Sequence, residues 1–101
     1  MASFNLSTAA ESDLLAIWRD TRDKWSEAQA DKYLDQLETV CNLIAEGELR
    51  EREMTDVHPD LRFHHSGLHY VFWLSQPTPL IIAFLHDRMD LVRHLGEQLD
   101  D

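Results

Sequence analysis

The sequence predicts one α+β domain spanning residues 1–101. It would contain an N-terminal strand, an antiparallel two-helix hairpin packed on a mainly antiparallel sheet of about four strands, and a short C-terminal helix. Apolar residues recur at helical spacing in the first half, whereas alternating and continuous apolar runs follow residue 60. Helices that precede strands, without alternating with them, favour the α+β class over α/β.

A short strand and a first helix are predicted at the start of the chain. Phe4 and Leu6 alternate with polar residues, which is the period of a half-buried strand. Thr8 is followed three residues later by Glu11, the pattern of a capping box. A helix is therefore expected over residues 9–24.

A second helix is predicted after a link of only a residue or two. Ser26 with Gln29 forms another N-cap pattern, and Gly47 is a natural helix stop. So short a link folds two helices back on each other. Cys41 falls on the inward stripe, where a thiol is more often core than nucleophile. The same stripe favours a core interpretation for four large side chains: Trp18, Trp25, Leu37 and Ile44.

The second half is predicted to be mainly strands. Residues 48–60 are polar and form a connecting segment, followed by strands over 61–65, 68–74 and 80–85. The second of these is apolar on both faces and the third almost continuously, so both belong in the middle of the sheet. Asp90 is predicted to cap a short helix that reaches residue 95 or 99.

Charge and composition exclude several classes of function. The formal net charge is −10, of which −8 comes from residues 1–60 and −2 from residues 61–101. We therefore expect no direct nucleic-acid binding, because phosphates require a basic surface. The opening "MASFNLS" has no features of an export signal, and the apolar run over residues 80–85 is too short to span a membrane. A single cysteine fits a reducing compartment, and a cytoplasmic protein without a membrane partner is expected.

The segment "HHSGLHY" raises the question of a metal site, a catalytic cluster or an ordinary hairpin. A two-residue turn at Ser66 and Gly67 would place His64 opposite His69, while His65 points to the other face. Zinc requires three or four ligands, and here only two histidines meet. We therefore expect neither a metal nor another cofactor.

Four segments together resemble the ParE branch of the RelE/ParE toxin superfamily: "AAESDLLAIWRDT", "QADKYLDQL", "HYVFW" and "FLHDRMDLVRHL". The resemblance covers nearly the whole chain, in order. It implies the toxin of a bacterial type II toxin–antitoxin pair, which inhibits an essential target, DNA gyrase, by binding without catalysis. It also implies a ParD-like antitoxin that wraps a C-terminal segment across the helical hairpin and sheet, giving a hetero-oligomer.

The resemblance assigns residues to each partner. Antitoxin contacts are expected at Leu14, Trp18, Trp25, Tyr33 and Leu37. Target contacts are expected at Arg62, His86, Arg88, Met89, Asp90, Arg93 and His94. Two structural alternatives remain open. Arg62 can instead form an ion pair with an acid of residues 48–56. In the corner over residues 86–90, Asp90 can cap the last helix, Met89 can fill the core, and His86 can form a hydrogen bond with a backbone group of the turn.

Two other functions remain open. Relatives in the mRNA-cleaving branch use clustered Lys and Arg, and here Arg62, His86 and Arg88 are the candidate catalytic set. An inactive relative that only binds its antitoxin is the second alternative. The negative charge departs from the pattern of the family, so we expect an antitoxin contact that is mostly apolar or that carries basic residues toward residues 1–60.

Overall fold

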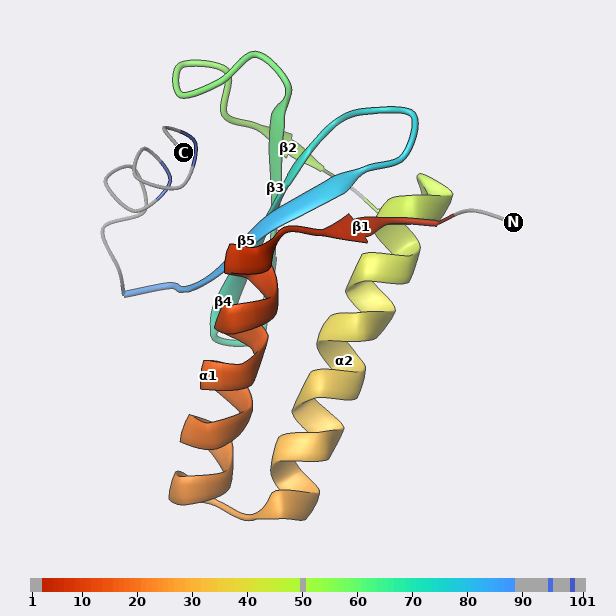
Figure 1. The fold of residues 1–101 in the computed structure, drawn as a ribbon. Coiled ribbons are helices and arrows are strands. Elements are labelled where there is room, and N and C mark those ends of the chain that lie inside the picture. Colours follow the sequence, from red (N-terminus) through yellow and green to blue (C-terminus); the bar gives the residue numbers. More distant parts are fainter. Residues whose placement is uncertain (1–2, 50, 89–94, 96–98, 100–101) are drawn as a thin grey trace.

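The computed structural model describes residues 3–49, 51–88, 95 and 99. Strand β1 (Asn5–Leu6) leads into helix α1 (Thr8–Lys24) and helix α2 (Glu27–Glu46). Strands β2 (Arg52–Glu53), β3 (Leu61–Ser66), β4 (His69–Leu74) and β5 (Leu80–His86) follow. Figure 1 shows α1 and α2 lying side by side as a hairpin beneath the sheet. The predicted α+β class is confirmed.

The five strands form one sheet in the order β1-β5-β4-β3-β2. Only β1 pairs in parallel, with β5, and all other neighbours are antiparallel. The central positions predicted for β4 and β5 are confirmed. The predicted number of about four strands missed β2, which pairs Arg52 with Phe63 and Glu53 with Arg62 inside the segment expected to be a connection. Two charged residues are too short a run to show a strand period.

Each face of the sheet carries its own core. The helix-facing core joins α1 and α2 to the sheet through Val71, Trp73, Ile81 and Phe84. The opposite core includes Phe72, Ile82 and Leu85, with Leu95 packed against them. Of the predicted C-terminal helix, the structure describes Leu95 and Leu99, both helical, and both pack on this opposite face. Met89, Asp90, Arg93 and His94 lie outside the described residues.

Helix starts are set by serine caps. Ser26 Oγ accepts from the backbone N–H of Gln29 at 3.1 Å, as predicted. The first cap is Ser7 and not Thr8, because the N–H of Ser7 donates to Ile81 O and holds Ser7 in extended backbone. Its Oγ accepts from Ala10 N and donates to Ile82 O at 3.3 Å, which joins the start of α1 to β5.

The β3–β4 turn lies at Gly67 and Leu68, one residue later than predicted. Gly67 has φ 62°, and glycine takes this region without the steric cost of a Cβ. His64 therefore pairs with Val71, and His65 with Tyr70. Each histidine of β3 thus pairs with a residue of β4 two positions later than predicted. Because side chains alternate between faces, His64 and His69 still share a face and His65 still points to the other.

Candidate functional site

A small apolar groove lies where β1 meets the helical hairpin, with a volume of about 200 Å³. We call it the N-terminal groove. Its lining residues come from the N-terminal segment and both helices: Phe4, Leu6, Leu14, Leu34, Leu37, Glu38 and Cys41. Six of these seven are apolar, so the groove suits an apolar side chain of a partner more than a charged ligand.

An open sheet edge adjoins this groove. Asn5 and Ser7 donate backbone hydrogen bonds to Pro79 O and Ile81 O of the β5 side, each at 2.9 Å. Because backbone groups alternate between the two edges of a strand, those of Leu6 point away from β5. Within the described residues β1 is the last strand at this edge. The groove and the edge together offer one apolar and one hydrogen-bonding surface to the same partner.

Two of the predicted antitoxin residues line this groove. Leu14 is part-buried and packs against the helix-facing core. Leu37 is fully buried, at 0% exposure, which confirms the core interpretation. It supports the groove from beneath and has no surface to offer a partner. Ile44, the other stripe residue, is 6% exposed and also lies in the core.

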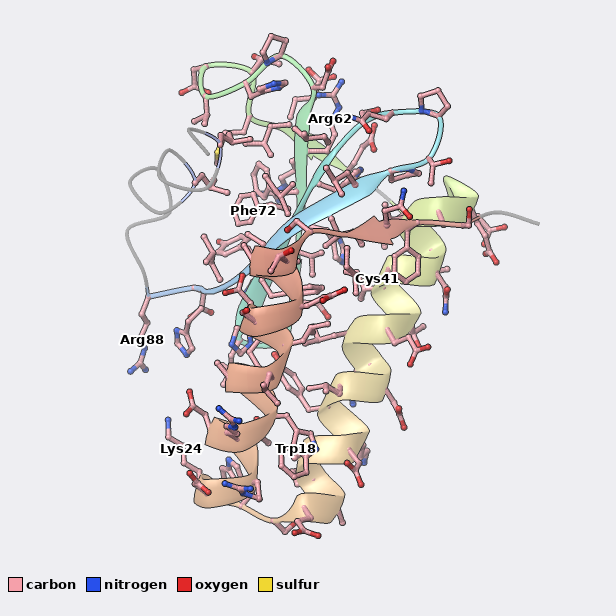
Figure 2. All side chains as sticks on the ribbon, viewed as in Figure 1. Trp18, Lys24, Cys41, Arg62, Phe72 and Arg88 are labelled. Atoms are coloured by element: carbon pink, nitrogen blue, oxygen red, sulfur yellow. The ribbon has the colours of Figure 1, made fainter. Side chains whose placement is uncertain are left out.

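The two tryptophans of the hairpin lie elsewhere. Trp18 is part-exposed, its Nε1–H donates to Asp31 Oδ1 at 2.9 Å, and the guanidinium of Arg22 lies 5.1 Å from its ring. Trp25 is 76% exposed, so its core interpretation is wrong. Helix α1 ends at Lys24, and the backbone of Trp25 leaves the helical region, so the apolar stripe stops short of it. Figure 2 shows Trp18 between the two helices and Lys24 near the end of α1.

A second depression of about 270 Å³ lies between the hairpin tip and the β3–β4 turn. We call it the hairpin hollow. It is bounded by both helices, the turn and the end of β5: Ile17, Asp20, Thr21, Lys24, Trp25, Gln29, Tyr33, Leu68, His69 and His86. Of the predicted antitoxin residues, Trp25 and Tyr33 belong to this hollow. It shares no lining residue with the N-terminal groove.

Tyr33 joins α2 to the β3–β4 turn in this hollow. Its hydroxyl lies 2.6 Å from His69 Nδ1 and accepts the backbone N–H of Leu68 at 3.2 Å. The hydroxyl also reaches Ser66 O, but at 3.5 Å, so the much shorter contact assigns the hydroxyl proton to His69 Nδ1, and a neutral His69 then carries its own proton on Nε2. A Cβ on Gly67 would lie 2.9 Å from the Tyr33 hydroxyl, which shows how closely the turn approaches the ring.

Burial sets the titration of this pair. The pKa of His69 falls from 6.5 to about 4, mainly because of burial and also because of the neighbouring His86, against the opposing charges of Asp87 and Asp20. Burial also raises the pKa of the Tyr33 hydroxyl. His69 is therefore neutral at physiological pH, and it acts as an acceptor at Nδ1 and a donor at Nε2.

The end of β5 brings His86 beside this pair. The rings of His69 and His86 meet edge to face, with centroids 5.3 Å apart. The backbone N–H of Arg88 donates to His86 Nδ1 at 3.1 Å, which partly confirms that His86 satisfies the turn. That bond needs a lone pair on Nδ1, so a neutral His86 also carries its proton on Nε2. Asp87 lies 3.2 Å from His65 Nε2 and 3.3 Å from His86 Nδ1.

Arg62 is engaged away from this corner. Its guanidinium faces Glu51 at 3.7 Å and Glu53 at 3.8 Å, and donates to the carbonyls of Pro59 and Leu61. The predicted ion pair with an acid of residues 48–56 is therefore present. Its Nε is buried without a hydrogen-bond partner, so the ion pair is imperfect.

The candidate catalytic set is not brought together. Arg62 aligns through Trp73 with Ile81, five residues before His86 on β5. At ~3.3 Å per residue, Arg62 and His86 are roughly 16 Å apart along the sheet. Arg88 is exposed and adjoins His86 at the other end. The two arginines and His86 therefore cannot act on one phosphate in this arrangement.

The described residues also show how the possible metal and thiol groups are placed. Within residues 3–49 and 51–88, no three His, Cys, Asp or Glu side chains converge as metal ligands would. Cys41 is buried, and burial with the nearby Glu38 raises the pKa of its thiol to about 12, so it stays protonated. None of the described helices is both long enough and apolar enough to cross a bilayer.

Sequence reasoning missed part of both surfaces. Leu34 of the groove was visible on the stripe of α2, and Leu6 on the alternating N-terminal strand. Leu68, 60% exposed, and Lys24 belong to the hollow. No local pattern indicated them, because the hollow forms only when the hairpin tip meets a turn more than 40 residues away in the chain.

Known proteins share this sequence pattern over most of its length. Residues 4–91 match the sequence profile of the family described as "ParE toxin of type II toxin-antitoxin system, parDE". A relative named "Toxin ParE", from Escherichia coli, is 38% identical over 101 residues, covering 98% of each chain. "Toxin ParE1" of Mycobacterium tuberculosis is 33% identical, covering 89% of this chain and 94% of its own. "Toxin ParE1" of Caulobacter vibrioides is 31% identical, covering 95% and 100%.

Proposed function

This chain belongs to the ParE toxin family of type II toxin–antitoxin systems, and on that footing we propose that it is a cytoplasmic toxin that arrests growth by binding DNA gyrase. We propose further that a ParD-like antitoxin neutralises it by filling the N-terminal groove and pairing with β1. The toxin and antitoxin then form a hetero-oligomer. The action is binding, without chemical transformation of the target.

The N-terminal groove beside an open strand edge is the observation that supports antitoxin docking. An amphipathic segment can place apolar side chains against Leu14 and Leu34 while its backbone pairs with Leu6. Such a segment orders as it binds, so it needs a large contact area to offset the lost entropy. The groove alone is small, so the segment must extend beyond it along the hairpin.

Charge narrows the chemistry of that segment. The exposed face of α2 carries Glu27, Asp31, Asp35 and Glu38, and the whole chain has a net charge of −10. A segment with basic residues beside its apolar ones is complementary to this surface. Its affinity should fall or stay level as salt rises, because salt screens attraction between exposed charges. Affinity that grows as salt rises from low values would instead indicate an acidic antitoxin repelled at close range.

The contacts of Arg62 support a toxin that acts by binding its target and not by cleaving RNA. A ribonuclease needs positive charge and an acid–base pair at one phosphate. Here Arg62 is engaged with Glu51 and Glu53, roughly 16 Å from His86 by strand spacing. The His86 corner also lies beside Asp87, which opposes the approach of a phosphate.

A groove variant tests antitoxin docking. Leu34→Asp places a charge at a part-buried position of the N-terminal groove, whereas Leu15→Asp changes a leucine of the hairpin that is 49% exposed and outside the groove. We expect the first to weaken binding of the cognate antitoxin at least roughly tenfold by calorimetry, and the second to leave it unchanged. Equal affinities for both variants would refute docking in the groove.

Expression without antitoxin tests the target. Growth arrest with broken DNA, together with inhibition of supercoiling by purified gyrase, is the expected result. Arrest that leaves purified gyrase untouched at high toxin excess would refute the gyrase assignment. Cleaved messages would indicate the ribonuclease alternative, and absence of arrest would indicate a relative that only binds its antitoxin.

A further inference from the structure

We propose that the hairpin hollow is the surface that contacts the target protein, and that it receives an uncharged segment with one large apolar side chain beside a backbone carbonyl. This inference rests on the proposed toxin function and goes beyond it, because it names a surface and the chemistry of its occupant. The hollow is separate from the groove proposed for the antitoxin.

Exposed apolar side chains gather at this hollow. Among the described residues, three large hydrophobic side chains are exposed: Leu15, Trp25 and Leu68. Trp25 and Leu68, at 76% and 60%, both border the hollow, from the helix link and the β3–β4 turn. A single exposed leucine needs no explanation, but two large apolar groups around one depression form a patch of the kind found at binding sites. Tryptophan is also enriched among the residues that dominate interface energies.

The polar groups of the hollow select an uncharged occupant. His69 and His86 each present an Nε2–H donor when neutral, which a carbonyl oxygen can accept. A carboxylate or phosphate would meet Asp20 and Asp87, whose charges reach His69. A cation could pair with Asp20, but it would leave both Nε2–H donors without an acceptor and would lie near Lys24. A backbone carbonyl satisfies the donors without either repulsion.

The charge balance of the hairpin tip also favours an uncharged occupant. Residues 17–33, which form the hairpin tip, contain four acids and four Lys or Arg, a balance of zero. The rest of the chain therefore carries the whole net charge of −10. The tip is thus the part of the helical hairpin that an uncharged protein surface can approach without electrostatic bias.

The hollow is already formed without a partner. Tyr33 fixes the turn through the hydrogen bonds to Leu68 N and His69, and Gly67 packs against its ring. The backbone N–H of Trp25 donates to Thr21 O at 2.9 Å, which fixes the opposite rim. A preformed site loses little conformational entropy on binding. The hollow also reaches His86, two residues before Arg88, and so continues into the corner expected from the sequence to contact the target.

Truncation of the two exposed side chains tests the proposal. The double variant Trp25→Ala, Leu68→Ala leaves the buried core intact, and Leu15→Ala is a matched control outside the hollow. All three proteins should melt at the same temperature, and each should still bind the antitoxin through the N-terminal groove. We expect the double variant to require roughly 10- to 100-fold more protein for growth arrest and for inhibition of gyrase supercoiling, while Leu15→Ala behaves as wild type.

The outcomes separate this inference from the proposed function. A folded double variant that arrests growth like wild type overturns the hollow as a target surface, whatever the gyrase result. Wild-type arrest without gyrase inhibition refutes gyrase as the target, while the growth phenotype of the variants still decides the role of the hollow. If the double variant loses antitoxin affinity as strongly as Leu34→Asp, the hollow is reassigned to the antitoxin. If Leu15→Ala loses as much toxicity as the double variant, the effect is nonspecific. Either result overturns the proposal.

Discussion

The part-buried Tyr33–His69 pair should make folding stability depend on pH below neutrality. The pKa of His69 falls from 6.5 to about 4 on folding, chiefly through burial. Because the unfolded chain then binds the proton more readily, this contribution is complete above pH 6.5 and is lost progressively as pH falls toward 4. The groups that face His69 are Tyr33 from α2, Asp20 from α1, and His86 with Asp87 at the end of β5.

The size of the effect follows from the two pKa values. Linkage gives about 2 kcal/mol lost at pH 5 and about 0.2 kcal/mol at pH 7. His69 is part-exposed, so solvent screening reduces this difference, and we expect about 1 kcal/mol between the two conditions. This is a measurable fraction of the stability of a domain of 101 residues.

Urea unfolding at pH 7 and pH 5, followed by circular dichroism, measures this term. His69→Asn removes the titrating ring while it keeps an acceptor close to the position of Nδ1, and His65→Asn removes an exposed imidazole of the same hairpin as a control. Wild type and His65→Asn should each lose about 1 kcal/mol more than His69→Asn between the two pH values. Equal losses in wild type and His69→Asn would refute the assignment of the pH dependence to this pair.

Two further substitutions and one labelling experiment test the fold around the two surfaces. Gly67→Ala should cost about 1–3 kcal/mol in urea unfolding, because φ is 62° and the new Cβ would meet the Tyr33 hydroxyl at 2.9 Å; a neutral result would contradict the close approach. Cys41, with its thiol pKa raised to about 12, should react with a thiol reagent at pH 8 only in urea, and fast native labelling would show that it is accessible. Leu37→Ala should lower the free energy of unfolding by about 2–5 kcal/mol; unchanged stability would contradict its full burial.

Helix and strand periodicity were readable because they depend on local chemistry. The alternation of Tyr70, Phe72 and Leu74 against Val71 and Trp73 predicted both faces of β4, and each group packs in a different core. Each core is built from side chains that repeat at the strand or helix period. Such repeats stay visible in the sequence without knowledge of the partner element.

Contacts between distant segments, and the ends of helices, account for the differences between the predicted and the observed structure. The predicted turn at Ser66 and Gly67 and the observed turn at Gly67 and Leu68 both contain Gly67. The observed one forms because the Tyr33 hydroxyl of α2 accepts the N–H of Leu68 and its ring packs against Gly67. The cap of α1 moved to Ser7 because β5 binds its backbone. Trp25 is exposed because it follows Lys24, the last residue of α1, and so lies off the apolar stripe on which its burial was expected. In each case the deciding group lies outside the local window or at a helix end.

The positions of the two surfaces constrain how an antitoxin can neutralise the toxin. The two surfaces adjoin along the helices, since Ile17 and Tyr33 of the hollow follow or precede residues of the groove closely in sequence. Lys24, at the far rim of the hollow, lies ten residues after Leu14 on α1, or roughly 15 Å along the helix axis. An antitoxin segment confined to the groove would leave Trp25 and Leu68 open to the target. Neutralisation by direct occlusion therefore requires a segment that continues about ten helical residues along the hairpin. A truncated antitoxin that ends at the groove should bind the toxin and still permit growth arrest, whereas full protection by such a fragment would show that the two surfaces are coupled in another way.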